Sequence, residues 1–253
     1  MKHKYTNDFY KDRDIKTSYS AQRILQIVQD NWGGGERIHS AVDIGCGVGT
    51  WLKQVHTLFQ TDDIQGYDGD YVDTEYLVIP KECFCPFDLE KEIPQIRRFD
   101  LAISLEVAEH LSPQRAESFV KDLCTLSDNI LFSAATVYQG GVGHINEQRL
   151  SYWVDKFSKL GYEARDIIRP KIWEDTKIPV WYRQNIIFFS KNKAMSYNKS
   201  STIIDIVHPE LYETRMALLQ HYNNKIYFKV YFIIRNFLAK IWHKNKINLK
   251  LKE

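Results

Sequence analysis

The sequence predicts an α/β fold in which a doubly wound, mostly parallel sheet carries helices on both faces, followed by a helical C-terminal appendage. Two observations predict it. Short segments rich in Val, Ile, Leu and Phe alternate with amphipathic helical patterns over the first 190 residues, which is typical of parallel strands joined by crossover helices. A run of closely spaced glycines also follows the first of these segments directly. The expected strands are residues 40–44, 64–67, 101–105, 129–133 and 186–190.

The intervening segments have the period of helices with one apolar face. Ser112-Pro113 is a helix start signal, and the three consecutive glycines at 33–35 are a stop signal. The expected helices are residues 21–31, 50–59, 114–126 and 151–160. Residues 191–202 are polar and lack periodicity, so we expect a linker there. This divides the chain into a main domain at 1–190, the linker, and an appendage at 203–253.

Composition restricts the function classes. The 253 residues carry 34 Lys and Arg against 32 Asp and Glu, so no overall charge favours a nucleic-acid partner. Residues 1–14 contain no apolar run that would serve as a secretion signal, and we expect a cytoplasmic protein. The cysteines lack the paired spacing of metal ligands, so no metal is expected. They are Cys46, Cys83, Cys85 and Cys124.

The appendage combines apolar and cationic residues. A helix is expected from about residue 209 to 221, and a run rich in Tyr, Phe, Ile and Lys begins at Lys225. The apolar stretch 227–242 is interrupted by Lys229, Arg235 and Lys240, so it falls short of the roughly 18 uninterrupted residues of a spanning helix. Two alternatives stay open: packing on the main domain or on a second subunit, and peripheral contact with the inner face of a membrane.

The glycine run follows the first expected strand without a gap. Gly45, Gly47 and Gly49 allow a sharp turn and a close approach of the backbone to a ligand, and a helix from about Thr50 would offer unpaired N–H groups. In the dinucleotide-binding fingerprint the third glycine stands five positions after the first, but here that position is Thr50. The candidate cofactor residues of this loop are Asp43, Gly45, Cys46, Gly47 and Gly49.

A nucleotide-type cofactor also needs an anchor for its ribose. In doubly wound sheets this is an acidic residue at the end of the second strand, roughly 20 residues past the glycines, because a carboxylate accepts hydrogen bonds from both ribose hydroxyls. Asp68 fits, whereas Asp70 and Asp73 are alternatives if the acid only serves the turn beside Gly69.

Asp88 is a second candidate for nucleotide recognition. It stands at a strand-to-helix turn, where its carboxylate would accept the adenine amino group while Leu89 packs on the ring. The alternative is that Asp88 only caps the helix before Pro94.

Polar residues gather abruptly where the later strands end. In the run 99–111 an apolar strand gives way to Glu106, Glu109 and His110, and the loop 139–148 follows the fifth expected strand. Ligands of open α/β sheets bind at this carboxyl edge. His110 and His144 are therefore candidate bases, and Glu147 is a third candidate catalytic residue.

Taken together, these motifs resemble a bacterial family of class I S-adenosylmethionine-dependent methyltransferases often associated with surface-polysaccharide biosynthesis. The resemblance implies a seven-stranded, Rossmann-like sheet with an antiparallel last strand. It also implies S-adenosylmethionine held by Asp43, Gly45, Gly47, Asp68, Asp88 and the turn Leu105-Glu106. Many members have Pro where this chain has Val137-Tyr138. The motifs are residues 43–52, 66–69, 99–111, 132–135, 139–148, 152–153 and 181–185.

The expected function is methyl transfer to a small polar acceptor of capsule or lipopolysaccharide synthesis, which releases S-adenosyl-L-homocysteine. A sugar hydroxyl stands ahead of an amine such as phosphoethanolamine. A hydroxyl must lose its proton, so a base such as His144 or Glu147 is expected to assist. An amine would be held by Glu106, Glu147 and either Tyr10 or Tyr19. The expected acceptor contacts are Tyr19, Asn146, Arg149, Arg183 and Asn185, with the two arginines meeting a phosphate if one is present.

Two other classes of function are alternatives to this hypothesis. The first is a catalytically silent cofactor-binding subunit that docks on a membrane or on a partner enzyme through its basic, aromatic tail. The second is nucleic-acid methylation, which is disfavoured because the cations are concentrated in the tail. The sequence also lacks an Asn- or Asp-Pro-Pro-aromatic motif for flipped bases.

Overall fold

The computed structural model describes residues 7–32, 37–94, 97–191 and 204–250, with side chains described between residues 16 and 237 of these ranges. The chain divides into two compact units, Met1–His208 and Pro209–Glu253. The glycines at 33–35 and the expected linker, apart from Lys191, lie outside the described residues.

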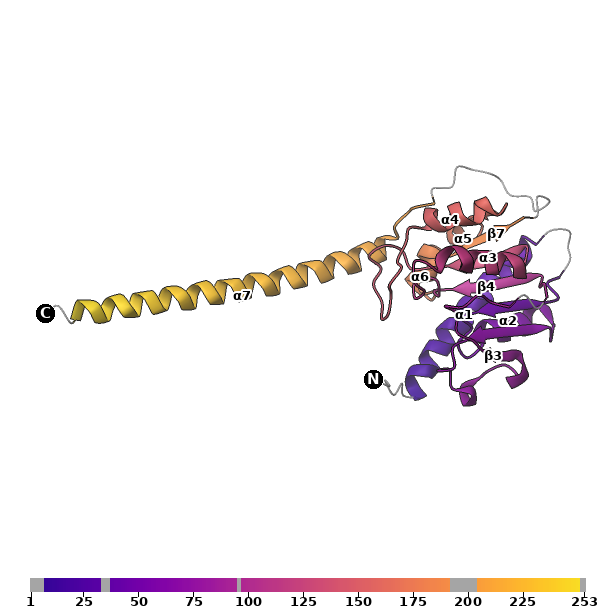
Figure 1. Ribbon diagram of the computed structural model, residues 1–253, viewed down its shortest axis with the longest axis horizontal. Helices are drawn as coiled ribbons and strands as arrows, with labels where there is room; N and C mark the ends of the chain where they lie inside the picture. The colour runs from indigo at the N-terminus through magenta and orange to yellow at the C-terminus, as the bar shows by residue number, and fades with distance from the viewer. Residues whose placement is uncertain (1–6, 33–36, 95–96, 192–203, 251–253) are drawn as a thin grey trace. The chain divides into compact units, whose positions relative to one another are not determined.

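The first unit contains a seven-stranded sheet in the order β3-β2-β1-β4-β5-β7-β6 (Figure 1). Strands β1 to β5 pair in parallel, and β7 runs antiparallel to both β5 and β6. The predicted doubly wound, mostly parallel sheet with an antiparallel last strand is therefore confirmed. The strands are β1 Ala41–Ile44, β2 Ile64–Asp68, β3 Phe84–Pro86, β4 Leu101–Leu105, β5 Asn129–Ser133, β6 Glu163–Arg165 and β7 Ile187–Ser190.

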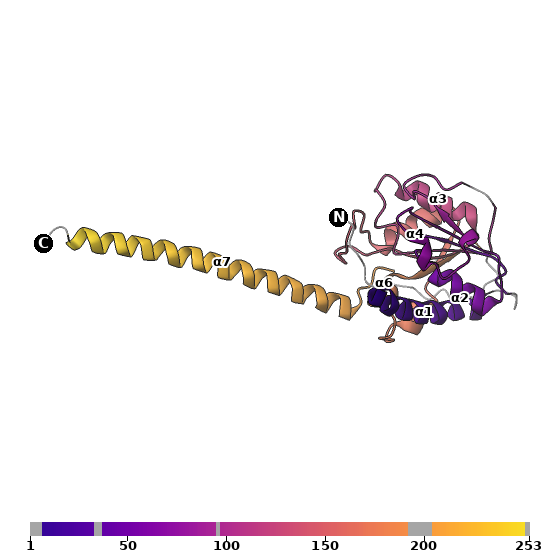
Figure 2. The same cartoon turned by 90° about the horizontal axis from the view of Figure 1, so that it is seen from below.

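Helices cover both faces of the sheet (Figure 2). On one face α1 (Asn7–Asp30), α2 (Thr50–Phe59) and the short α5 (Arg169–Ile172) and α6 (Val180–Asn185) share a core with residues such as Leu52 and Ile103. On the other face α3 (Ala116–Leu126) and α4 (Leu150–Lys159) pack around Phe132. The two cores explain why the strands are apolar on both sides.

The five predicted strands are all present, each within one residue of its expected ends. Strands β3 and β6, which were not predicted, are three residues long and lie at the two edges of the sheet. Such short edge strands carry too few residues for a periodic signal. Helix α1 begins at Asn7, well before the expected start at residue 21.

Residues 204–208 belong to the first unit, which extends beyond the domain boundary expected at 190. The Asp205 carboxylate accepts a 2.6 Å hydrogen bond from the Ser151 hydroxyl, and the Ile204 carbonyl accepts one of 3.0 Å from Arg169 Nη1. His208 is buried beside Arg183, whose Nη1 lies 3.0 Å from His208 Nε2. These contacts tie the segment to α4, α5 and α6.

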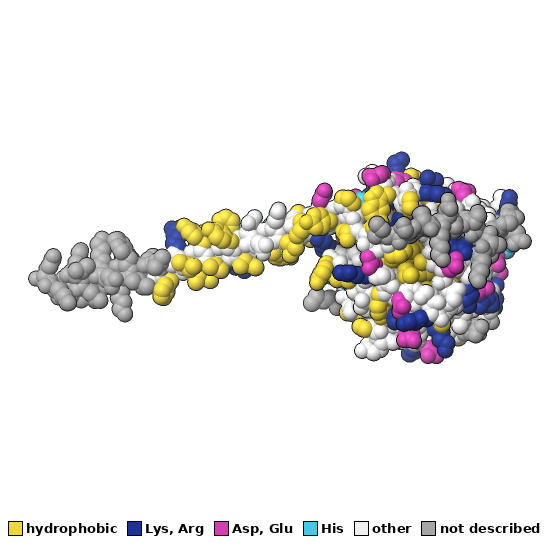
Figure 3. All heavy atoms as spheres, turned by 90° about the horizontal axis from the view of Figure 1, so that it is seen from above, with side chains coloured by type: hydrophobic (Ala, Val, Ile, Leu, Met, Phe, Trp, Pro, Cys, Tyr) yellow, Lys and Arg dark blue, Asp and Glu magenta, His cyan; other side chains and the backbone are white. Residues whose placement is uncertain are grey.

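The second unit is one helix, α7, which spans Pro209–Lys250 and is 42 residues long. It begins where the sequence predicted a helix but continues far past the expected end at residue 221. Apolar side chains are exposed along it between Tyr222 and Phe237 (Figure 3). Within the described residues, α7 included, no helix is both long enough and apolar enough to cross a bilayer.

Candidate functional site

The glycine loop between β1 and α2 has a backbone that side chains would distort. Gly45, Gly47 and Gly49 have φ angles of 87°, 54° and 88°, in the left-handed region. A Cβ on Gly45 would stand 2.2 Å from Val107 Cγ2, and one on Gly49 would stand 2.7 Å from Ile79 Cγ1. A Cβ on Gly47 would meet open space. The loop thus packs closely at its two ends and is open at its middle.

Asp68 at the end of β2 holds this loop. Its Oδ2 accepts a 2.7 Å hydrogen bond from the Gly47 amide, and its Oδ1 accepts one of 2.7 Å from the Gly69 amide and one of 2.5 Å from the Tyr71 hydroxyl. Of the two alternatives, Asp73 instead caps a short 3₁₀ helix, Thr74–Tyr76, by accepting from the Glu75 amide. Asp68 is therefore the carboxylate that connects the second strand to the glycine loop.

A cavity of about 840 Å³ opens at the carboxyl ends of β1 to β4. Gly45 lines it from the first strand, residues 68–71 from the second, residues 86–91 from the third, and Glu106, Val107, His110 and Leu111 from the fourth. Its volume falls within the usual range for a site that takes a small molecule or cofactor. Because β1 lies between β2 and β4, the cavity stands at the point where the winding of the sheet reverses, where ligands of such folds bind.

The predicted cofactor residues divide between the cavity wall and the interior. Asp88 and Leu89 line the cavity, while Asp88 also accepts a hydrogen bond from the Glu90 amide, so it serves the turn as well. Asp43 and Leu105 are buried within their strands. Burial, together with the nearby charge of Asp68, raises the pKa of Asp43 well above its usual value.

Cys46 is buried beneath the glycine loop. Its Sγ would stand 2.6 Å from a Cβ on Gly66, so the thiol packs against β2. Burial raises the pKa of this thiol. Only the backbone of Cys46 belongs to the turn, where its amide donates to the Tyr67 carbonyl at 3.1 Å.

Glu106 follows β4 directly and has an unusual conformation. Its φ of 55° is in the left-handed region, which costs a non-glycine residue about 1–2 kcal/mol. Two amides hold its carboxylate: Gln139 Nε2 donates at 2.9 Å, and Asn185 Nδ2 donates at 3.1 Å. Burial raises the pKa of Glu106, while these hydrogen bonds counteract the rise. Asn185, predicted to contact the acceptor, thus positions Glu106.

The loop 139–148 brings His144 and Glu147 to the end of β4. The amides of Ile145 and Asn146 donate to the Glu109 carbonyl at 2.9 and 3.0 Å, which fixes the loop against the residues after the strand. His144 Nδ1 lies 2.9 Å from Glu147 Oε1. The His144 and His110 rings are perpendicular, with centroids 4.8 Å apart. The structure therefore brings together the three residues that the sequence predicted to be catalytic.

Glu109 is a site residue that the sequence analysis did not select. It is fully buried, and neither carboxylate oxygen makes a hydrogen bond of ordinary geometry to the described residues. Burial raises the pKa of Glu109 to about 9, and the charge of Glu106 adds to the rise. The sequence signal that could have indicated Glu109 is its position three residues after Glu106 and directly before His110.

The other predicted acceptor residues lie elsewhere. The Tyr19 hydroxyl donates to Asp175 at 2.9 Å, and Arg149 is exposed just before α4. Asn146 is buried and accepts a hydrogen bond from Gln148. Arg183 is buried and donates from Nε to the Ile178 carbonyl at 2.8 Å, so it is not part of the cavity wall. The side chain of Tyr10 lies outside the described residues.

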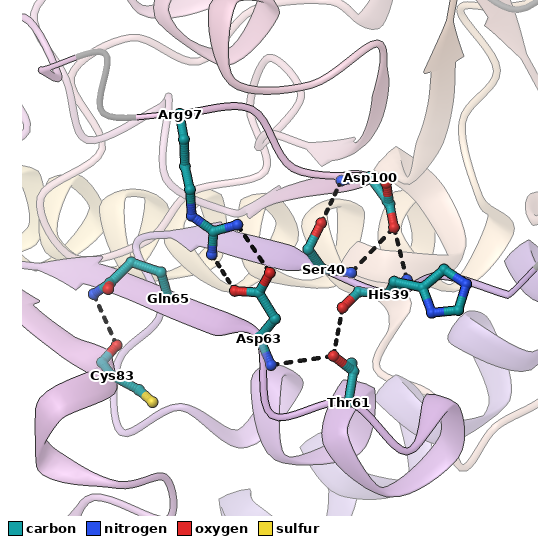
Figure 4. Close-up of polar contacts among 8 residues, drawn as sticks. All are labelled: His39, Ser40, Thr61, Asp63, Gln65, Cys83, Arg97 and Asp100. Atoms are coloured by element: carbon teal, nitrogen blue, oxygen red, sulfur yellow. Dashed lines mark hydrogen bonds and ion pairs between the residues drawn. The ribbon is translucent and has the colours of Figure 1, made fainter.

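The amino ends of the strands use their polar residues differently (Figure 4). Asp100 Oδ2 accepts from the amides of His39 and Ser40 at 2.7 and 3.1 Å, and the Arg97 guanidinium pairs with Asp63. Here polar groups connect β1, β2 and β4 to one another. At the carboxyl ends, by contrast, Glu106 and His110 face a cavity.

Comparison with known proteins supports the fold. No protein-family model and no curated protein matches the chain. Magnesium protoporphyrin IX methyltransferase from Synechocystis PCC 6803 with bound SAH is 16% identical with a TM-score of 0.50, over 74% of this chain and 89% of that one. The plantazolicin methyltransferase BpumL in complex with SAH and a pentazolic desmethylPZN analog is 15% identical with a TM-score of 0.49, over 73% and 88%. The methyltransferase domain of bacterial CtHen1 is 19% identical with a TM-score of 0.47, over 69% and 96%. The chain thus has the Rossmann-like fold of class I methyltransferases.

Proposed function

We propose that the protein is an S-adenosylmethionine-dependent methyltransferase. The observation that carries this proposal is the hydrogen bond from the Gly47 amide to Asp68, which lines the cavity. A carboxylate at this position accepts hydrogen bonds from ribose hydroxyls. The open middle of the glycine loop leaves room for the rest of the nucleoside. Asp88 and Leu89, farther along the same wall, suit the adenine ring.

The proposed acceptor is a small polar molecule of cell-surface glycan synthesis, and a sugar hydroxyl is the first candidate. S-adenosylmethionine would supply a methyl group on a sulfonium, which leaves readily. In the transfer the acceptor oxygen forms a bond to the methyl carbon, the carbon–sulfur bond breaks, and the hydroxyl proton must be removed. Alignment alone contributes up to about 7–11 kcal/mol to such reactions.

His144 suits the removal of that proton. Its Nδ1 is held by Glu147, so Nε2, which lies beside Gly141, is the ring nitrogen that would take the proton. A positioned base of this kind contributes roughly 10²–10⁴-fold to the rate. His110, which lines the cavity next to His144, is the alternative base.

One observation supports the second candidate acceptor, an amine such as phosphoethanolamine. Glu106 lines the cavity at the end of β4, and a carboxylate there can hold an amine by accepting hydrogen bonds from its N–H groups. An amine must arrive unprotonated, so methyl transfer to it depends less on His144.

Labelled S-adenosylmethionine, incubated with nucleotide sugars, lipid-linked glycans and phosphorylated amines, would identify the acceptor. Replacement of His144 by Ala should lower turnover at least about tenfold for a hydroxyl acceptor, and less for an amine.

Cofactor binding tests the proposal directly. Asp68→Asn removes the negative charge that accepts from Gly47, Gly69 and a ribose, so we expect affinity for S-adenosylmethionine to fall at least about tenfold in calorimetric titration. Asp73→Asn is the matched control, because Asp73 is exposed and caps a separate turn, and it should bind as the unchanged protein does.

Equal affinity of both variants, or absence of binding by the unchanged protein, would contradict the proposed cofactor site. Binding without transfer to any acceptor in the panel would favour the silent cofactor-binding subunit instead.

A further inference from the structure

Three side chains beside the cavity have the composition of a metal-binding group. Glu109, His110 and His144 each present one potential ligand atom, and these atoms lie within 4.8 Å of one another. Glu109 and His110 follow β4, whereas His144 comes from the loop after β5. The group therefore joins two segments that are 34 residues apart in the sequence.

Glu109 is the most informative member of this group. Its side chain is fully buried, yet neither oxygen makes a hydrogen bond of ordinary geometry to the described residues. A buried carboxyl group without such partners is unfavourable as an anion, so it either keeps its proton or has an opposite charge or a metal ion beside it. The described side chains place no Lys or Arg in an ion pair with Glu109.

The two histidines are oriented as metal ligands usually are. Glu147 lies 2.9 Å from Nδ1 of His144, in the arrangement by which a carboxylate fixes the tautomer of a metal-bound imidazole. Gly143 lies beside the His110 ring, since a Cβ on Gly143 would stand 3.5 Å from His110 Nδ1. Glu147 thus holds His144 at Nδ1, and Gly143 lies on the Nδ1 side of His110, so Nε2 of each ring is the candidate ligand atom.

We propose that Glu109, His110 and His144 bind one divalent transition-metal ion, with the remaining coordination positions open toward the cavity. Two imidazoles and one carboxylate suit ions such as Zn²⁺, Mn²⁺ or Fe²⁺, whereas Mg²⁺ and Ca²⁺ prefer oxygen ligands throughout. At metal–ligand distances of about 2.0–2.2 Å the ligand atoms stand roughly 3–3.5 Å apart, so binding would draw these side chains together.

The ion gives the acceptor a binding site, a role that rests on the proposed methyl transfer. An acceptor hydroxyl that coordinates the open positions has a lowered pKa and loses its proton to water. Its oxygen then forms the bond to the methyl carbon as the carbon–sulfur bond breaks. In this arrangement His144 acts as a ligand, so a hydroxyl or diol acceptor is favoured over an amine.

Titration of the full chain, without an affinity tag, with Co²⁺ tests the site. We expect one equivalent to bind with a visible absorption band, and Zn²⁺ to compete for it. Glu109→Gln, which preserves size, and His144→Ala should each weaken Co²⁺ affinity at least about tenfold. His56→Ala is the matched control, because His56 is exposed and bonds to the Thr61 carbonyl and Asp62; its affinity should not change.

A second measurement does not depend on variants that fold. In the unchanged protein, Mn²⁺ below one equivalent should broaden the imidazole NMR signals of His110 and His144 before that of His56. Failure of the unchanged protein to bind Co²⁺ or Mn²⁺, or equal broadening of all three histidines, would overturn the metal site. S-adenosylmethionine affinity, measured in the same samples, separates the two proposals. Metal binding without cofactor binding would contradict only the proposed methyltransferase function. Cofactor binding without metal binding would contradict only the metal site.

Discussion

Asp68 shows how much one carboxylate contributes at the residue scale. Both of its oxygens accept hydrogen bonds, from the glycine loop on one side and from Gly69 and Tyr71 on the other. The Tyr71 side chain is 80% exposed, so its hydroxyl can leave Oδ1 when a ribose arrives. Asp68 therefore has a structural role in the loop, and under the proposed function it also anchors the ribose.

Asp43, two residues before the glycine loop, should make stability depend on pH. Its pKa is raised by burial and by Asp68, so the folded state binds a proton that the unfolded state releases at about pH 4. Its contribution to stability is complete below that pH and is lost as pH rises through the raised pKa. We expect Asp43→Asn to gain stability relative to the unchanged protein over this window, measured by urea unfolding at a series of pH values.

The control for Asp43 is Glu117→Gln, which alters an exposed carboxylate in the first turn of α3. Its urea curves should keep a constant offset from those of the unchanged protein. If Asp43→Asn shows the same constant offset, Asp43 does not titrate with a raised pKa.

At the element scale, helix α6 positions Glu106, the residue that follows β4. Asn185 at its last turn bonds Glu106, which lies 79 residues earlier in the chain. Arg183, two positions before it, donates from Nε to the Ile178 carbonyl and from Nη1 to the Trp173 carbonyl at 3.1 Å. A buried guanidinium thus ties α6 to the end of α5 and to His208.

Arg183→Lys should therefore destabilise the first unit. The single ammonium nitrogen of a lysine cannot take the positions of both Nε and Nη1, so at least one buried carbonyl loses its charged donor, and we expect a loss of about 2–3 kcal/mol in urea unfolding. Arg98→Lys is the matched control, since Arg98 pairs with Asp128 at the surface and should cost less than about 1 kcal/mol. Equal costs for both variants would show that the buried contacts of Arg183 do not stabilise α6.

At the scale of the whole molecule, α7 carries two kinds of surface. Ile226, Val230, Ile233 and Phe237 recur at intervals of four and three residues and form an apolar stripe, and all four are exposed. Lys229 stands beside this stripe, and Lys225 and Arg235 lie farther round the helix, where Phe228, Tyr231 and Phe232 are also exposed. An exposed apolar stripe of this length is characteristic of a helix that associates with another surface.

We expect the full chain to associate through this stripe, either with a second copy or with anionic vesicles. A chain that ends after His208 should do neither, measured by sedimentation and vesicle flotation. Ending the chain at His208 keeps the contacts of 204–208 with α5 and α6, whereas ending it at Ser200 would remove them. If the full and shortened chains both sediment as monomers and neither floats, the stripe has no such role.

Local features of the sequence predicted much of the fold and half of the site. The five longer strands and the glycine loop depend on side-chain period and on the φ angles that glycine permits, both of which act over a few residues. Asp68 was predicted because the number of residues from a glycine loop, through the crossover helix, to the end of the next parallel strand varies little. The short edge strands β3 and β6 were not found, because three residues carry no periodic pattern.

Sequence alone therefore determined the five longer strands, the glycine loop and the carboxylate of the proposed methyl-donor site, since each follows from a local pattern or from the usual spacing along the chain. Only the tertiary structure decided which polar residues meet beyond them. In the tertiary structure Arg183 bonds to the Ile178 carbonyl rather than lining the cavity, and Asn185 bonds to Glu106. Glu109 lies close to His110 and His144. These pairings depend on how the loop after β5 lies against the end of β4. That is set by packing and by backbone hydrogen bonds between distant segments, which no local pattern records.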